Sequence, residues 1–178
     1  MKTYTLKDGR SFILRQPRLE DAAVMIEHPK RVGAETDFLL CDENGLPGLT
    51  LERERDYIQN TLSLPGTAMF LGFVGEELVS LCDVRAGTNP RTSHNGRIAI
   101  SVLKDYWHLG IGGILMQAMI DFARASGTIK NLQLEVRADN ARAIALYERF
   151  GFRQCGRSTR HIQVRGEYFD ELSMELLL

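Results

Sequence analysis

The sequence has few cysteines, and the three that it has are scattered. Cys41, Cys82 and Cys155 form no Cys-x-x-Cys pair and belong to no Cys/His cluster with zinc spacing. This pattern argues against a disulfide framework and against a metal site. It favours a protein of a reducing compartment.

The sequence also lacks a long apolar run and an excess of charge. No stretch approaches the ~20 apolar residues that span a bilayer, and residues 1–8 lack the apolar core of a secretory signal. We therefore expect a cytoplasmic protein with no membrane partner. The formal net charge is -1, whereas nucleic-acid binders usually carry a basic excess, so nucleic acid is not an expected partner.

What remains is typical of one compact α/β domain over residues 1–178, with 44% hydrophobic residues. Apolar spacing predicts strands at 12–14, 68–74, 78–84, 98–102, 132–136, 152–164 and 167–178, and helices at 18–28, 51–62, 111–122 and 143–150. Pro29 is expected to end the first helix. The first half then forms an antiparallel meander, and the strand–helix–strand unit in the middle implies one parallel pair. The predicted fold is a mixed central sheet flanked by about four helices.

A glycine-rich segment, Trp107-His108-Leu109-Gly110-Ile111-Gly112-Gly113, joins a predicted strand to a strongly amphipathic helix. Glycine lets the backbone approach a ligand closely, and a helix start offers free N–H groups and a positive dipole end. Such a segment suits a diphosphate. A plain glycine-rich turn is the alternative.

Two other phosphate-binding motifs do not fit this segment. A Walker A loop needs a Gly-Lys pair that is absent, and Leu115 stands at the third glycine position of a dinucleotide-binding fingerprint. A dinucleotide-binding domain also usually opens with its motif, whereas an antiparallel half comes first here. A nucleotide-binding protein of another class is therefore disfavoured.

A second motif runs from Asp139 to Phe152 on the next helix. Asp139 or Asn140 can cap this helix, and Tyr147 lies on its apolar face. A buried tyrosine hydroxyl needs a polar partner. Tyr147 is therefore either a core residue bonded to a carbonyl or a functional phenol.

Together the two motifs resemble the GNAT superfamily of N-acetyltransferases. The resemblance is specific over 94–152, the predicted cofactor-binding core, and looser to Leu178. The matches to the two family motifs are Gly110, Gly112, Asn140, Ala143, Leu146, Tyr147, Gly151 and Phe152. Trp107 departs from the family pattern, which has Gln or Arg at that position.

The resemblance implies an acetyl-CoA-dependent N-acetyltransferase without a metal, acting on a primary amine of a small molecule, amino acid or peptide. By the same resemblance the Val102 N–H stabilises the oxyanion and Tyr147 protonates the leaving thiolate. The residues implied to bind the cofactor are Val102, Leu103, Lys104, Leu109, Gly110, Ile111, Gly112, Gly113, Asn140, Arg142 and Tyr147. For Arg142, a solvated helix position is an equal alternative to a phosphate contact.

The base that deprotonates the amine stays open. His94, Asp83, Glu35 and Asp37 are candidates, and each is also explained as a surface or structural residue; His28, His108 and His161 show no partner spacing. The acceptor is expected between the loop from Glu35 to Leu49 and the last hairpin near Arg165 to Asp170. There Glu35, Asp37 and Asp170 are candidates to attract a cationic amine.

Two further questions stay open in the sequence. The alternative function is a non-catalytic acyl-CoA-binding sensor or partner-docking module, which would bind coenzyme A without releasing thiol. A homodimer through the terminal strand, which ends in Leu176-Leu177-Leu178, is a further prediction.

Overall fold

The computed structural model describes residues 1–178, which form four α-helices and an eight-stranded sheet. The strands are β1 (Lys2–Thr5), β2 (Ser11–Arg15), β3 (Thr67–Val74), β4 (Glu77–Ala86), β5 (Asn95–Val102), β6 (Asn131–Arg137), β7 (Arg153–Val164) and β8 (Glu167–Leu177). The helices are α1 (Ala22–Glu35), α2 (Leu51–Ser63), α3 (Ile111–Ala125) and α4 (Ala141–Arg149), with short 3₁₀ turns at Leu19–Asp21 and Lys104–Tyr106. The predicted fold class is confirmed.

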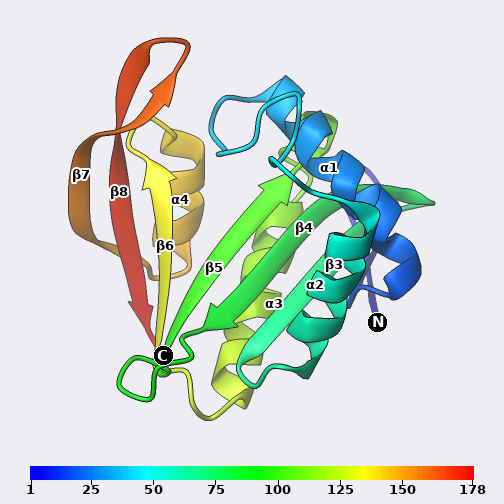
Figure 1. Cartoon of the computed structure of the whole chain (residues 1–178), viewed down its shortest axis with the longest axis horizontal. Coiled ribbons are helices and arrows are strands. Elements are labelled where there is room, and N and C mark those ends of the chain that lie inside the picture. Colours follow the sequence, from blue (N-terminus) through cyan, green and yellow to red (C-terminus); the bar gives the residue numbers. More distant parts are fainter.

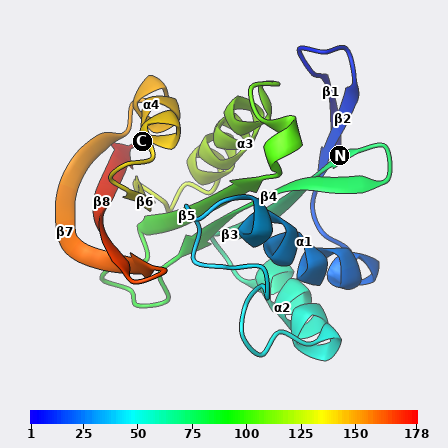
Figure 2. The same cartoon turned by 90° about the horizontal axis from the view of Figure 1, so that it is seen from above.

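Helices cover both faces of the sheet (Figures 1 and 2): α1 and α2 lie on one face, and α3 and α4 on the other. Each face has its own apolar cluster. Met25, Ile58 and Met69 belong to the smaller cluster under α1 and α2, whereas Leu115 and Met119 of α3 belong to the larger one. None of the helices combines the length and the apolar composition that a membrane-spanning helix needs.

The strand order is β1-β2-β3-β4-β5-β6-β8-β7, and every neighbouring pair is antiparallel except β5–β6. The predicted meander and the single parallel pair are both confirmed. β5 and β6 pair only over residues 95–97 and 131–133. Beyond that point the two strands diverge (Figure 1), which opens the sheet at their carboxyl ends.

One predicted helix boundary is wrong. Pro29 lies inside α1, which continues to Glu35. A proline removes one N–H donor from the helix ladder, but here the helix goes on to bury Val32 and Gly33. Gly33 is required because a Cβ there would lie 2.1 Å from the Asp42 carbonyl oxygen, where the following loop crosses the helix.

The terminal strand β8 lies between two others rather than at an edge. It pairs with β6 up to Leu177 and with β7 up to Glu175. The outer strand on this side of the sheet is therefore β7, and the homodimer stays a prediction.

Candidate active site

The divergence of β5 and β6 opens into a cavity of about 1030 Å³. One wall, the α3–α4 wall, is formed by the end of β5, the start of α3 and the first turns of α4. The other, the α1–α2 wall, is formed by α1, α2, β4 and the loop at 36–50. Residues that line the cavity on the α3–α4 wall are Val102, Gly110, Ile111, Gly112, Gly113, Asn140, Arg142 and Tyr147, which brings together most of the predicted site.

The start of α3 presents a row of free amides. None of the N–H groups from His108 to Gly113 donates a hydrogen bond within the protein. Gly110 precedes the helix with φ 96°, a left-handed conformation that favours glycine. A Cβ on Gly112 would lie 3.0 Å from Leu146 Cδ2, so its lack of a side chain keeps α3 and α4 close. Free amides at a helix start form an anion site.

Positive side chains accompany these amides. Lys7, from the turn between β1 and β2, lines the same cavity, as do Arg142 and Arg149 of α4. The Arg142 guanidinium stacks on the Trp107 ring, 3.1 Å from its centroid. Arg142 is therefore packed against Trp107 rather than purely solvated, and its contact with a cofactor phosphate stays a prediction.

Val102 is the last residue of β5, where the strand still pairs with β4 but no longer with β6. The Leu103 N–H donates to the Val79 carbonyl on β4 at 2.9 Å. Since backbone groups alternate in direction along a strand, the N–H and C=O of Val102 point the other way, toward β6. The opened sheet leaves β6 out of reach there, so the Val102 N–H faces the cavity.

Three residues predicted to contact the cofactor lie outside the cavity lining. Leu103 is buried in the larger apolar cluster. The Lys104 N–H donates to the Glu35 carboxylate at 2.7 Å, and the Leu109 carbonyl accepts from the Lys7 N–H at 3.3 Å. The roles of these three stay predictions.

Asn140 and Tyr147 reach the cavity from α4. Asn140 caps the helix, because its Oδ1 accepts from the Ala143 N–H at 3.2 Å. The side-chain NH₂ group of Asn140 remains free to donate. Tyr147 is 6% exposed, and its hydroxyl has no hydrogen-bond partner in the protein. The core-tyrosine alternative needed a carbonyl partner, which this hydroxyl lacks. Burial raises the pKa of Tyr147 to about 12, although nearby Arg142 opposes the shift.

The α1–α2 wall carries two buried carboxylates. Asp83 on β4 is bonded to Arg85 at 2.8 Å, whereas Glu54 on α2 is 5% exposed and has no ionic partner. Burial raises the pKa of both side chains. Tyr57 and Arg85 line the cavity with these two acids. Burial raises the pKa of Tyr57, and the Asp83 carboxylate adds to this shift.

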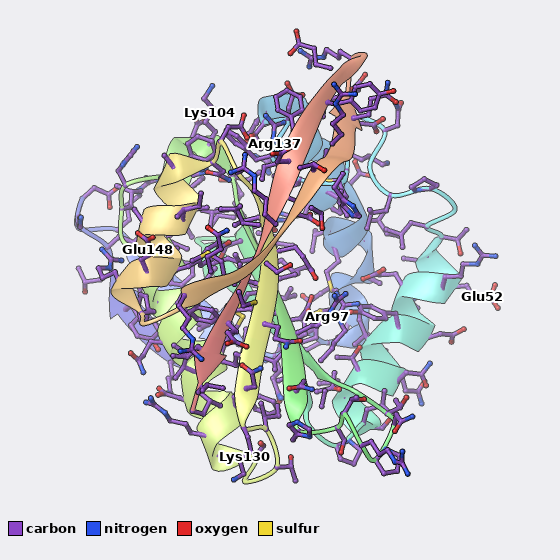
Figure 3. All side chains as sticks on the ribbon, turned by 90° about the vertical axis from the view of Figure 1, so that its left-hand side faces the viewer. Glu52, Arg97, Lys104, Lys130, Arg137 and Glu148 are labelled. Carbon is purple, nitrogen blue, oxygen red and sulfur yellow. The ribbon has the colours of Figure 1, made fainter.

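Of the four candidate bases, Asp83 alone lines the cavity. His94 is exposed on a loop, Glu35 is bonded to the Lys104 N–H, and Asp37 pairs with Arg165 at 3.0 Å. Asp170, a candidate for attracting an amine, pairs with Arg157 at 2.6 Å. Glu54 was missed, although its spacing gives a signal: it lies four positions before the buried Ile58, on the same face of α2. Glu52 is exposed on the same helix (Figure 3).

His28 was also missed as a cavity residue. Its Nε2 lies 2.9 Å from Ser101 Oγ, so it joins α1 to the end of β5. Burial lowers the pKa of His28 to about 4, and the imidazole is neutral at pH 7. A neutral group with so low a pKa is a weak base for an alkylammonium.

The loop after α1 and the last hairpin meet at Arg137, near the end of β6 (Figure 3). Its guanidinium lies between the rings of Phe38 and Phe169, at 4.8 and 3.7 Å, and donates to the Asp37 carbonyl at 2.8 Å. The two segments expected to flank the acceptor are thus held together. The loop lines the cavity with apolar residues, but the hairpin tip at 165–170 does not reach it.

The donor set fits coenzyme A. Free amides and cations suit a diphosphate, and the free strand edge at Val102 suits an amide-bearing arm. No group of three or more His, Cys, Asp or Glu side chains is arranged to hold a metal ion.

This geometry defines a class: an α/β protein whose cavity lies where two parallel strands diverge. The family model of the Acetyltransferase (GNAT) family matches residues 36–152. The chain therefore belongs to the GNAT family, whose members are acyltransferases.

Two curated relatives are N-acetyltransferases. The L-amino acid N-acetyltransferase AaaT of Escherichia coli K12 is 27% identical over 110 residues, which cover 62% of this chain and 68% of the relative. The [ribosomal protein bS18]-alanine N-acetyltransferase of the same strain is 47% identical over 56 residues, 32% of this chain and 37% of the relative.

Solved structures extend the likeness to the whole domain. A GNAT acetyltransferase from Streptococcus pneumoniae superposes with a TM-score of 0.90 at 30% identity, covering 94% of this chain and 99% of that one. A Salmonella typhimurium structure solved with its cofactor acetyl-CoA has a TM-score of 0.80 at 16% identity, covering 93% of each chain, and shows the shared fold.

Proposed function

We propose that this protein transfers the acetyl group of acetyl-CoA to a primary amine of a small molecule, amino acid or peptide. The amine attacks directly, through a tetrahedral intermediate. One observation carries the proposal: the free amides of His108 to Gly113 and the unpartnered hydroxyl of Tyr147 open into one cavity. The amides hold the diphosphate, and the phenol lies where the acyl group would arrive.

The α3–α4 wall supplies the binding and electrostatic parts of the reaction. Acetyl-CoA brings an activated thioester, whose carbonyl oxygen becomes negative as the amine attacks. The Val102 N–H faces the cavity and stabilises that charge, an effect typically worth 10²–10³ in rate for one donor. The free amide group of Asn140 is placed to hold the arm of the cofactor against β5.

Tyr147 provides a proton to the departing sulfur. Because burial raises its pKa to about 12, the phenol keeps its proton throughout the neutral range. It donates a hydrogen bond as negative charge develops on the thiolate, and Arg142 lowers the cost of any phenolate that forms.

The α1–α2 wall supports an amine as the acceptor. Glu54 is a buried carboxylate without a counterion, and Asp83 is only partly neutralised by Arg85. A cationic acceptor would form an ion pair with Glu54, whose ionised form is otherwise destabilised by burial without a partner. Asp83 aligns with Ala99 of β5, three positions from Val102, which is about 10 Å along the strand. It therefore acts on the amine through water or as a binding group rather than by direct contact.

The test is a thiol-release assay with acetyl-CoA and a panel of amines, amino acids and short peptides. We expect thiol release that depends on both substrates, with cationic acceptors preferred. Saturable coenzyme A binding without thiol release from any acceptor would instead support the non-catalytic module.

A further inference from the structure

The acids of the α1–α2 wall lie at a distance from the reacting centre. Asp83 pairs with Ala99 of β5, about 10 Å along the strand from Val102, and its carboxylate is bonded to Arg85, which lies still further away in the ladder. In the proposed reaction the attacking nitrogen lies about 3 Å from the thioester carbon, whose oxygen is about 3 Å from the Val102 nitrogen. A gap of roughly 5–8 Å therefore separates that nitrogen from the Asp83 carboxylate.

Glu54 lies at the same end of the cavity as Asp83. It is one helical turn before Ile58 on the face of α2 that packs on β3, and Ile58 shares an apolar cluster with Met69. Met69 is the β3 partner of Asp83 in the ladder, so its side chain lies on the same face of the sheet. The pKa of Tyr57 is raised first by burial and then by the charges of Asp83 and Glu54, as expected if both acids lie near this phenol.

This end of the cavity carries an uncompensated negative charge. Asp83 is bonded to Arg85 at 2.8 Å, whereas Glu54 is 5% exposed and has no ionic partner. Arg53, next to Glu54 in the chain, donates to the Gly48 carbonyl instead. A buried, unpaired carboxylate that lines a cavity favours a ligand that brings a cation.

Uncharged side chains lie between this end and the reacting centre. The next pair of the β4–β5 ladder on this face, toward Val102, is Leu81 with Ser101, and both line the cavity. Ser101 is bonded to His28, whose imidazole is neutral at pH 7 because burial lowers its pKa to about 4. Such a stretch suits a short apolar chain rather than a second charge.

We propose that the acceptor is a diamine: one primary amine attacks the thioester, and a short apolar chain joins it to a second cation, which Glu54 and Asp83 bind. This inference rests on the proposed function and narrows its acceptor. An extended chain with bonds of about 1.5 Å advances about 1.25 Å per bond, so the gap of roughly 5–8 Å matches a spacer of about four or five carbons.

The reaction balances with one amine neutral and the other charged. The attacking ammonium first releases a proton to solvent, and its nitrogen then forms the C–N bond as the C–S bond breaks. The nitrogen loses a second proton, and the thiolate gains one from Tyr147. The second amine keeps its proton throughout, because its charge is what the two carboxylates bind.

Thiol-release kinetics with matched acceptors test this inference. We expect kcat/KM to be at least about 10-fold higher for the five-carbon diamine cadaverine than for pentylamine, which has the same chain and one amine, by the worth of a charge-assisted hydrogen bond. An ω-amino acid of similar length, with an anion at its far end, should be poorer than pentylamine. Equal values for cadaverine and pentylamine would overturn the inference and leave the acetyltransferase intact. Protein that binds coenzyme A but releases no thiol with any amine would instead overturn the proposed function.

The product gives a second test on the wild type. Acetylation removes the charge of an amine, so monoacetylated cadaverine lacks the second cation and should be a poor acceptor. With excess acetyl-CoA, mass spectrometry should show one acetyl group per cadaverine. A second acetylation at a comparable rate would contradict the inference.

A pair of variants tests the assigned side chain. Glu54→Gln should lower the ratio of kcat/KM for cadaverine to that for pentylamine at least about fivefold, because it removes the charge that binds the second cation. Glu52→Gln, on the exposed face of α2, should keep the wild-type ratio. Coenzyme A binding by both variants in calorimetry verifies that they fold. A wild-type ratio in Glu54→Gln would overturn the role of Glu54.

Discussion

The two walls of the cavity are built in different ways. The α3–α4 wall offers backbone groups: the free amides of residues 108–113 and the strand edge at Val102. The α1–α2 wall offers side chains, chiefly Glu54, Asp83 and His28, which come from three elements. The backbone groups of the α3–α4 wall suit the diphosphate and arm that every acyl-CoA shares. The side chains of the α1–α2 wall can be substituted to suit a different acceptor without a change in the fold.

The largest effect is expected from the phenol on the α3–α4 wall. Tyr147→Phe removes the proton donor and little volume, so kcat should fall by about 10²-fold, a typical value for general acid catalysis. The Kd for coenzyme A should stay within about twofold. Steady-state kinetics and calorimetry on the same preparation measure both values, and a wild-type kcat would remove Tyr147 from the mechanism.

A side chain on Gly110, at the start of α3, should weaken the binding of coenzyme A by the free amides of residues 108–113. Gly110→Ala places a Cβ on a residue at φ 96° and turns the adjacent N–H groups away from the diphosphate, so coenzyme A affinity should fall about 10-fold.

Gly127→Ala is the matched control for this change. Gly127 follows the other end of α3 with φ 68°, and neither glycine has an atom within 4 Å of the added Cβ. Both variants should lose about 1 kcal/mol of unfolding free energy, and Gly110→Ala alone should lose affinity. Equal affinities in calorimetry would mean that the amides do not bind the cofactor.

A substitution on the α1–α2 wall should change the KM for the acceptor amine and leave the affinity for the cofactor unchanged. Glu54→Gln should raise the KM for a cationic amine by about 10-fold, the cost of one charge-assisted hydrogen bond, and leave the Kd for coenzyme A unchanged. Glu52→Gln, on the exposed face of the same helix, is the control. If both variants had the same KM, the α1–α2 wall would not recognise the charge of the acceptor.

The smallest effect concerns stability. Because burial raises the pKa of Glu54, the folded protein binds this proton more tightly than the unfolded chain does. The destabilising contribution is absent below the unfolded pKa of about 4.3 and complete once the pH exceeds the folded pKa. Glu54→Gln should therefore resist urea better than the wild type at pH 7, and the difference should vanish near pH 4.

An unchanged difference between pH 7 and pH 4 would mean that the Glu54 carboxylate is well solvated. The Asp83→Asn variant serves for comparison, because Arg85 offsets part of the burial of that side chain.

The two walls also differ in how far the sequence predicts them. Local patterns predicted a helix cap at Asp139 or Asn140, of which Asn140 is the cap, and they also predicted the glycine-rich start of α3 and the single parallel pair. These depend on neighbours within a few residues. The continuation of α1 past Pro29 was not predicted, because it depends on burial against the sheet.

The α1–α2 wall depends on contacts between residues far apart in the chain. Glu54 and Asp83, from α2 and β4, line one cavity only in the folded chain, and His28 meets Ser101 across 73 positions. No local spacing carries this information.

Calorimetric titration of the wild-type protein with coenzyme A tests the central claim most directly. We predict saturable binding to one site per chain, and a marked loss of affinity when the ligand lacks its diphosphate, as pantetheine does. Folded protein that gives no binding heat, or that binds pantetheine as tightly as coenzyme A, would contradict the account.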